Sequence, residues 1–353
     1  MTPTVDGTVP TPISVAFDVE GVCPLKAVQI DSLVILKIIK HSRESLTFHP
    51  ATGQLLGLDM NGILQITNSF PLSHGNEGEN VSSLAQNRVV YMQQMMRCLK
   101  EIGVDNNVVG WYQSVHSGAF INTTLIENQF SYHQALNDRT VVLIHDASQS
   151  TYETLSLKAF RLTPSFVAAR KEGKFNIESV VKYGLSYANI LEELPLQIHN
   201  SHLAISLLHY LDNKYRLVPT APALSLNLLT PNFDNLEPIV DSYYEKILEN
   251  LLETIDDYQY EQSNFQYYQR TLAREQLKIQ QWLQKRRAEN TARSISDQPL
   301  LPEDEWQRLF KLPNEPSRLE SLLLASQIDY YCKKIDTNST SVLTKLYASI
   351  SRQ

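Results

Sequence analysis

The stretch that decides the fold is Val108–Ser131, VVGWYQSVHSGAFINTTLIENQFS. It begins with apolar and aromatic residues, which predict a buried strand, and continues into a polar loop with one histidine. A helical pattern follows from Asn122, whose side chain is suited to accept hydrogen bonds from the free amides of a helix start. A strand, a loop with a histidine and a helix in this order raise the question of a metal site.

The residues on both sides of this stretch alternate between strand and helix patterns, from residue 27 to about residue 164. Asn61-Gly62 separates two apolar runs, GQLLGLDM and ILQITNSFPL, and therefore predicts a β-hairpin. Helices are expected at residues 31–45, 82–103 and 122–136. This alternation predicts an α/β domain with a mixed central β-sheet flanked by helices.

The last third of the chain, from about residue 236, shows only helical patterns. A long helix is expected first, and two shorter helices are expected at residues 317–334 and 341–350, after the break LPNEPS. Because an apolar stripe on so long a helix must be buried against something else, we expect it to bind a partner. The stripe residues are Tyr244, Ile247, Leu251, Tyr258, Phe265 and Leu272.

Composition and charge narrow the class of protein. The net charge of −7 argues against general attraction to nucleic acid. The candidate site for a direct RNA contact is the small basic cluster Lys285-Arg286-Arg287. Cys23, Cys98 and Cys332 form no CxxC pair, which argues against a disulfide framework and a thiolate zinc site. The absence of a long apolar run predicts no membrane association, and we expect a cytoplasmic protein.

The motifs QLLGL and VVGWY and the helix through Glu127 resemble the MPN (Mpr1/Pad1 N-terminal) family of zinc-dependent isopeptidases, over residues 27 to about 164. Active members carry a glutamate before the first motif, then His-x-His and Ser-x-x-Asp after the second. Two imidazoles and one carboxylate hold Zn²⁺ there and leave one position for water, whose pKa falls to about 7.

The resemblance places unsuitable residues at every one of these positions. In chain order they are Pro50 for the glutamate, Gln113 and Val115 for the histidines, Thr123 or Asn122 for the serine, and Ile126 or Leu125 for the aspartate. His116 and Glu127 lie next to these positions, but neighbouring residues on a strand or a helix point in other directions. We therefore expect no catalytic residue, no metal and no cofactor.

Three further blocks narrow the resemblance: IDSLVILKIIKH (30–41), LSLKAFRLTP (155–164) and SRLESLLLASQIDYYCKKI (317–335). Together with WYQS they resemble the H-subunit family of eukaryotic translation initiation factor 3. That resemblance implies a non-catalytic structural subunit that supports mRNA recruitment and assembly of the 43S preinitiation complex on the small ribosomal subunit. It also implies a second MPN subunit and PCI subunits as partners, the latter joined through a bundle of C-terminal helices.

The expected domain organisation has four parts: a flexible tail (1–24), the MPN domain (25–165), an extension and linker (166–235), and helices for bundle assembly (236–353). Two other functions stay open. One is an MPN-type zinc deubiquitinase with divergent ligands, completed by a partner. The other is an inactive MPN scaffold of the proteasome lid or the signalosome.

Overall fold

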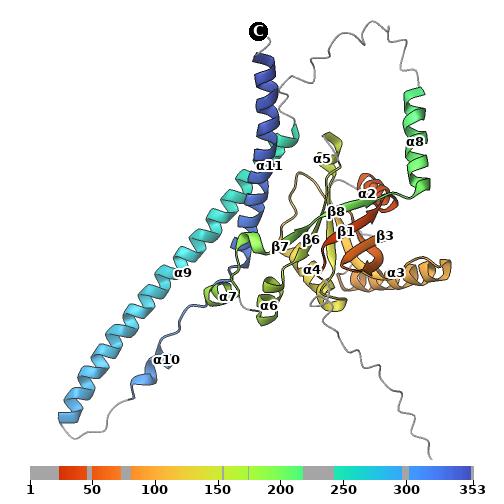
Figure 1. Cartoon of the computed structure of the whole chain (residues 1–353). Coiled ribbons are helices and arrows are strands. Elements are labelled where there is room, and N and C mark those ends of the chain that lie inside the picture. The colour runs from red at the N-terminus through yellow and green to blue at the C-terminus, as the bar shows by residue number, and fades with distance from the viewer. Residues whose placement is uncertain are drawn as a thin grey trace, which may run out of the picture.

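The computed structural model describes residues 24–45, 50–72, 81–152, 155–173, 175–217, 242–295 and 302–350 (Figure 1). Its centre is an eight-stranded mixed sheet with the strand order β7-β6-β5-β4-β2-β3-β1-β8. The strands are β1 (Ala27–Asp31), β2 (Thr52–Met60), β3 (Ile63–Leu72), β4 (Val108–Val115), β5 (Val141–Asp146), β6 (Leu157–Leu162), β7 (Leu191–Leu194) and β8 (Leu196–His199). The expected mixed sheet is therefore confirmed, while nearly all of the expected tail lies outside the described residues.

The β2–β3 hairpin turns at Asn61-Gly62 as the sequence predicts. Asn61 has φ of +53° and Gly62 φ of +82°. Both residues are in the left-handed region that a tight two-residue hairpin requires, and asparagine and glycine enter that region at the lowest cost.

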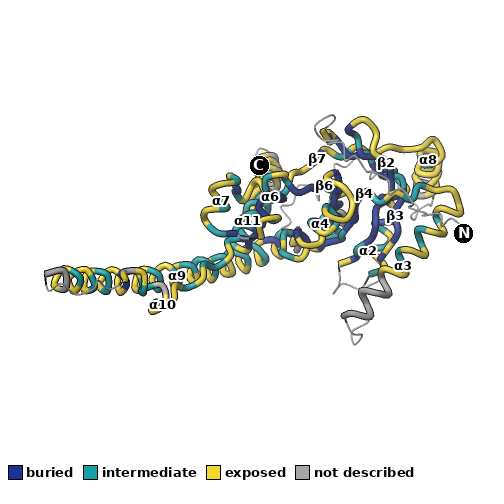
Figure 2. Tube along the Cα trace, turned by 90° about the horizontal axis from the view of Figure 1, so that it is seen from below, coloured by how far each residue is buried: buried dark blue, intermediate teal, exposed yellow. Residues whose placement is uncertain are grey.

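Helices cover both faces of the sheet: α2 (Ser32–Glu44), α3 (Val81–Ile102), α4 (Thr123–Ala135), α5 (Ala147–Tyr152), α6 (Pro164–Glu172), α7 (Ile177–Lys182) and η1 (Tyr187–Asn189). Helix α8 (His202–Leu217) follows β8 and lies away from the sheet, with mostly exposed side chains (Figure 1). Side chains alternate between the faces, so Trp111 belongs to one buried cluster and Tyr112 to another. The cluster around Trp111 includes residues of α4 and α6, and the cluster around Tyr112 includes residues of α2. Figure 2 shows the resulting concentration of buried residues along the strands.

The sheet extends beyond the boundary expected at residue 165. β7 pairs with β6 at one edge, and β8 pairs with β1 at the other. The first part of the expected extension (166–235) therefore completes the sheet, and a division at residue 165 would cut through it. Residues 218–241, which contain the expected linker, lie outside the described residues.

The C-terminal part forms a long arm that returns to the sheet (Figures 1 and 2). Its elements are α9 (Ser242–Ile295), η3 (Glu303–Glu305), α10 (Trp306–Leu309) and α11 (Leu319–Ile350). With 54 residues, α9 is about 80 Å long. The prediction of two shorter helices was wrong, because α11 is continuous. In its polar middle, the hydroxyls of Thr337, Ser339 and Thr340 donate to carbonyls three residues back, so these polar groups are satisfied within the helix.

Candidate functional site

The positions that the MPN resemblance assigns to the histidines lie on β4. Gln113 and Val115 are two residues apart, so they share the face of the sheet that carries Trp111. Val115 is buried in the cluster around Trp111, and Gln113 is half-buried. Neither the amide nor the isopropyl group makes a zinc ligand of the imidazole type.

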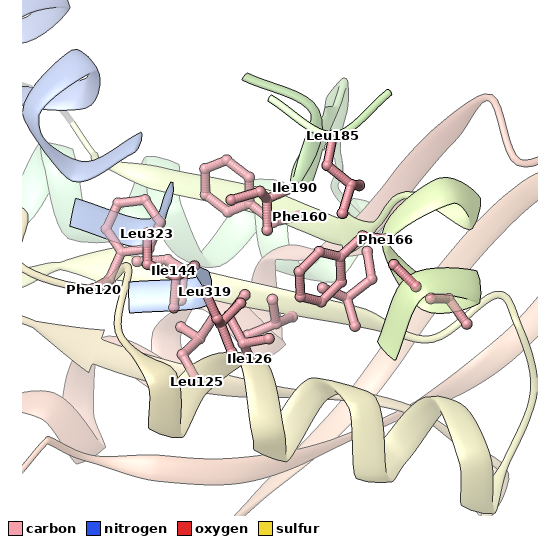
Figure 3. Packing of buried hydrophobic residues seen from close by; sticks show 14 of the residues in the cluster. Phe120, Leu125, Ile126, Ile144, Phe160, Phe166, Leu185, Ile190, Leu319 and Leu323 are labelled. Atoms are coloured by element: carbon pink, nitrogen blue, oxygen red, sulfur yellow. The ribbon is translucent and has the colours of Figure 1, made fainter. Parts of the chain in front are cut away.

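The position assigned to the aspartate lies on α4. Gln129 fixes this helix to the sheet, because its Oε1 accepts a 2.8 Å hydrogen bond from Trp111 Nε1 and its Nε2 donates one of 2.8 Å to the Thr140 carbonyl. Asn122 caps the helix by accepting from the Leu125 amide at 2.8 Å, as the sequence predicts. The result places Ile126 in the core with 0% exposure (Figure 3).

The two remaining positions lie at the rim of this cluster. Pro50, at the glutamate position, is exposed, and the next residue, Ala51, is tied to β4 by the buried Ser114. The Ala51 amide donates to Ser114 Oγ at 2.8 Å, and the Ser114 amide donates to the Ala51 carbonyl at 2.8 Å. Thr123, at the serine position, is half-buried in the first turn of α4.

His116 and Glu127, the two neighbouring residues that could replace lost ligands, have separate partners. The exposed His116 places Nδ1 3.3 Å from Ser148 Oγ, and Glu127 pairs with Arg170 at 3.4 Å. Among the described residues, no group of three or more His, Cys, Asp or Glu side chains could hold a metal ion. The described geometry therefore does not assemble a zinc site from these two residues.

Helix α11 covers the cluster that contains Val115 and Ile126. Leu319 and Leu323 are buried in it, as Figure 3 shows. Gln327 fixes the helix to the loop after β4, because its Nε2 donates to the Gly118 carbonyl and its Oε1 accepts from the Ile121 amide, both at 2.9 Å. The first turns of α11 are thus part of the core on this face of the sheet.

The same loop carries an aromatic contact with α11. The ring of Phe120 meets that of Tyr330 edge to face, with centroids 4.9 Å apart. Gly118, in the left-handed region at φ of +72°, leaves room for this ring, since an added Cβ would lie 2.9 Å from Tyr330 Cε1.

Asp146, at the end of β5, fixes the start of α9. Its Oδ1 accepts from the amides of Ser148 and Gln149, and its Oδ2 accepts from the Tyr243 hydroxyl at 3.1 Å. Burial raises the pKa of the Asp146 carboxyl, and these hydrogen bonds oppose the rise. The hydrogen bond with Tyr243 therefore joins the end of β5 to the arm.

The predicted stripe on α9 faces the chain's own residues. Ile247 is 1% exposed and packs with Tyr331 of α11. Tyr244 and Leu251 pack against the same cluster. The rest of the stripe, Tyr258, Phe265 and Leu272, is half-buried. Farther along the arm, the guanidinium of Arg318 lies 3.3 Å from the Phe265 ring centroid. Partner binding by this stripe stays a prediction, and Ile247 has almost no surface to offer.

The basic cluster near residue 286 lies within α9, which continues to Ile295. The guanidinium of Arg286 lies 4.7 Å from the Trp282 ring centroid and pairs with Glu305 of η3. The positive charge of Arg286 is therefore paired within the arm, whereas the side chain of Lys285 is exposed.

Sequence reasoning did not find Gln327, Gln129 or Tyr243, which hold α11, α4 and α9 in place. A buried glutamine interrupts the apolar period in the same way as an exposed one. The weak signal for Gln327 is its place in LLLASQIDYY, where the surrounding apolar positions predict burial.

Two family models match the chain. Residues 24–138 match the model described as JAB1/Mov34/MPN/PAD-1 ubiquitin protease, so the sheet with α4 defines an MPN-class protein. Residues 150–353 match the model described as the C-terminal region of eIF3h. No helix within the described ranges is both long and apolar enough to span a membrane.

Curated relatives named as the H subunit of eukaryotic translation initiation factor 3 cover nearly the whole chain. The one from Aspergillus fumigatus is 46% identical over 93% of this chain and 96% of its own length. The one from Coccidioides immitis is 48% identical, over 92% and 95%. This chain belongs to the H-subunit family of eukaryotic translation initiation factor 3. The predicted family is confirmed, and the relatives' names support neither the deubiquitinase nor the lid and signalosome alternatives.

Proposed function

We propose that this chain is a non-catalytic structural subunit of the translation initiation factor 3 complex. The observation that carries the proposal is the apolar cluster at the expected metal position, where Val115 and Ile126 are buried under Leu319 and Leu323 of α11. A catalytic zinc needs three protein ligands and an open position for water. A filled apolar cluster offers neither, and it excludes the water that the hydrolytic reaction consumes.

The partners we propose are other subunits of the complex, including a second MPN subunit and PCI subunits. Exposed apolar side chains gather on helices away from the filled cluster, as expected of a surface that partners cover. On α8 they are Leu203, Ile205, Leu207, Leu208, Tyr210 and Leu211, and on α3 they are Val89, Val90 and Ile102. Such surfaces support a subunit whose role is to bind other proteins.

The cellular role follows from this assembly. In this proposal the complex as a whole, rather than this chain alone, contacts the small ribosomal subunit in the cytoplasm. That contact supports mRNA recruitment and assembly of the 43S preinitiation complex. The net charge of −7 disfavours direct RNA binding over most of the surface. Lys285 and its basic neighbours offer few phosphate contacts.

The experiment is affinity purification of the tagged full-length chain, with mass spectrometry of the bound proteins and metal analysis of the purified chain. We expect initiation factor 3 subunits and no stoichiometric zinc. Proteasome-lid or signalosome subunits in their place would overturn the assignment. Stoichiometric zinc, lost on His116→Ala and Glu127→Ala, together with cleavage of ubiquitin dimers, would overturn the non-catalytic role.

The full-length chain is necessary for this test. A version that ends near residue 235 would lack Leu319, Leu323 and Gln327, and would expose the cluster that they cover. Loss of partners from such a version would report on damage to the MPN core as well as on a missing docking surface.

A further inference from the structure

A cavity of about 390 Å³ lies between the sheet and α11. Its walls come from the loop after β4, from β6 and β7, from η1 and from the middle of α11. The residues that line it include none of the positions that the MPN resemblance assigns to the zinc ligands. Its volume is at the lower end of the range typical of pockets for small organic ligands.

Aromatic rings form the floor of this cavity. The ring centroid of Phe120 lies 5.2 Å from that of Phe160 and 4.9 Å from that of Tyr330. Phe120 and Phe160 are buried (Figure 3), and Tyr330 is half-buried. Leu191 of β7 adds an aliphatic wall. Because aromatic rings pack well against other flat apolar groups, the floor suits a ligand with an aromatic ring.

Paired charges form the rim of the cavity. Lys158 places Nζ 3.2 Å from a carboxylate oxygen of Glu193 and 5.5 Å from the centroid of the Tyr330 ring. Lys333 pairs with Asp329 at 2.6 Å. The hydrogen bond to Asp329 raises the pKa of Lys333, and the charge of Glu193 adds to that rise. Glu193 therefore acts on two ammonium groups at the mouth of the cavity.

The lining as a whole has an excess of positive charge. Lys334 also lines the cavity, and its charge acts on the buried Asp146 as well. Three lysines and two carboxylates thus give the lining one net positive charge. The side chain of Glu193 is 54% exposed, so another carboxylate can approach the same lysines beside it. The hydroxyls of Ser326 and Thr337 line the same cavity and can donate to such a group.

We propose that this cavity binds an aromatic group that carries a carboxylate. The ring packs on Phe120, Phe160 and Tyr330, and the carboxylate lies between Lys158 and Lys333. A cationic ligand would meet the net positive charge of the lining. A wholly apolar ligand would cover the ammonium groups without giving them a partner, which is costly. A free aromatic acid and a polypeptide that ends in an aromatic residue share this chemistry.

The test measures binding of N-acetylphenylalanine to the purified full-length chain by ligand-detected NMR. N-acetylphenylalaninamide keeps the ring and lacks the charge, and N-acetylglycine keeps the charge and lacks the ring. We expect a dissociation constant of about 1 mM for N-acetylphenylalanine and at least tenfold weaker binding of the other two. Equal binding of the acid and the amide, or no binding of the acid, would overturn the proposal.

Variants locate the binding within the cavity. Lys158→Gln with Lys333→Gln should weaken the binding of N-acetylphenylalanine at least tenfold. The control, Lys246→Gln with Lys311→Gln, removes the same charge at exposed positions outside the cavity and should keep the affinity within twofold. Ala188→Phe fills the cavity from η1, leaves both lysines in place and should abolish binding. Undiminished binding by the Ala188→Phe variant would overturn the proposal.

A second pair of probes separates the two sources of the ligand. Phenylpropionate represents the free acid, and a five-residue peptide that ends in phenylalanine represents the polypeptide. The tighter binder identifies the source, and the same peptide with an amidated C-terminus should bind at least tenfold more weakly than the free peptide. Failure of this proposal would leave the proposed function standing, because that function does not use the cavity.

Discussion

Gln327→Leu tests whether α11 belongs to the MPN core or only rests on it. The glutamine is 4% exposed and makes two hydrogen bonds of 2.9 Å to the loop after β4. Leucine keeps most of the side-chain volume but can replace neither bond. The change therefore removes the polar connection while leaving the apolar packing of Leu319 and Leu323 in place.

The expected loss of stability follows from the two loop groups that lose their partner. An unsatisfied buried donor or acceptor costs about 1–3 kcal/mol. The Gly118 carbonyl is buried, so we expect its loss of a partner to cost an amount in the middle of that range. The Ile121 amide is half-buried, so we expect a cost at the lower end. We expect α11 to open at a free energy lower by about 2–4 kcal/mol, or about 30-fold to several hundred-fold more often.

Native-state hydrogen exchange is the suitable assay, because a chain of this size need not unfold in one step. The Ile121 amide and the amides of α11 near residue 327 should exchange faster by that factor. Gln276→Leu, at an exposed position of α9, is the matched control. Unchanged exchange at Ile121 in Gln327→Leu would refute the argument.

Three further changes probe the same core. Gly118→Ala should lower the free energy of unfolding by about 2–3 kcal/mol, since φ is +72° and the new Cβ meets Tyr330. The control is Gly103→Ala, where φ is +78° and no atom lies near the new Cβ, so it measures only the cost of the backbone conformation. Equal losses of stability at the two sites would show that the contact with Tyr330 adds nothing. Burial lowers the pKa of His145 from 6.5 to about 4, so the folded chain binds this proton less tightly than the unfolded one. Stability should therefore fall as pH drops from about 6.5 toward 4, and His145→Leu should flatten that slope in urea titrations; an unchanged slope would count against it. Ile126→Asp places a carboxylate in the apolar cluster and should cost more than about 3 kcal/mol, so a variant that melts with the parent would contradict the closed site.

The local features of the fold could be predicted because each depends on a few adjacent residues. Asn61-Gly62 determines the hairpin turn, and Asn122 caps α4 through its own side chain. The strand VVGWY could be recognised from its apolar run, since both of its faces are buried. For these elements the short-range pattern and the tertiary structure agree.

The parts that could not be predicted depend on contacts between distant residues. Gln327 meets Gly118 across 209 positions, and Tyr243 meets Asp146 across 97. Periodicity identified the predicted stripe of α9 as a face that must be buried but could not say which chain buries it.

The filled cluster and the arm are physically linked. With apolar side chains at Val115 of β4 and Ile126 of α4, the sheet and the helix together form a surface on which the leucines of α11 are buried. Gln327 then fixes the orientation of α11 on the loop, and Asp146 holds the first turn of α9 beside it. The base of the arm therefore lies on the positions that the MPN resemblance assigns to zinc ligands.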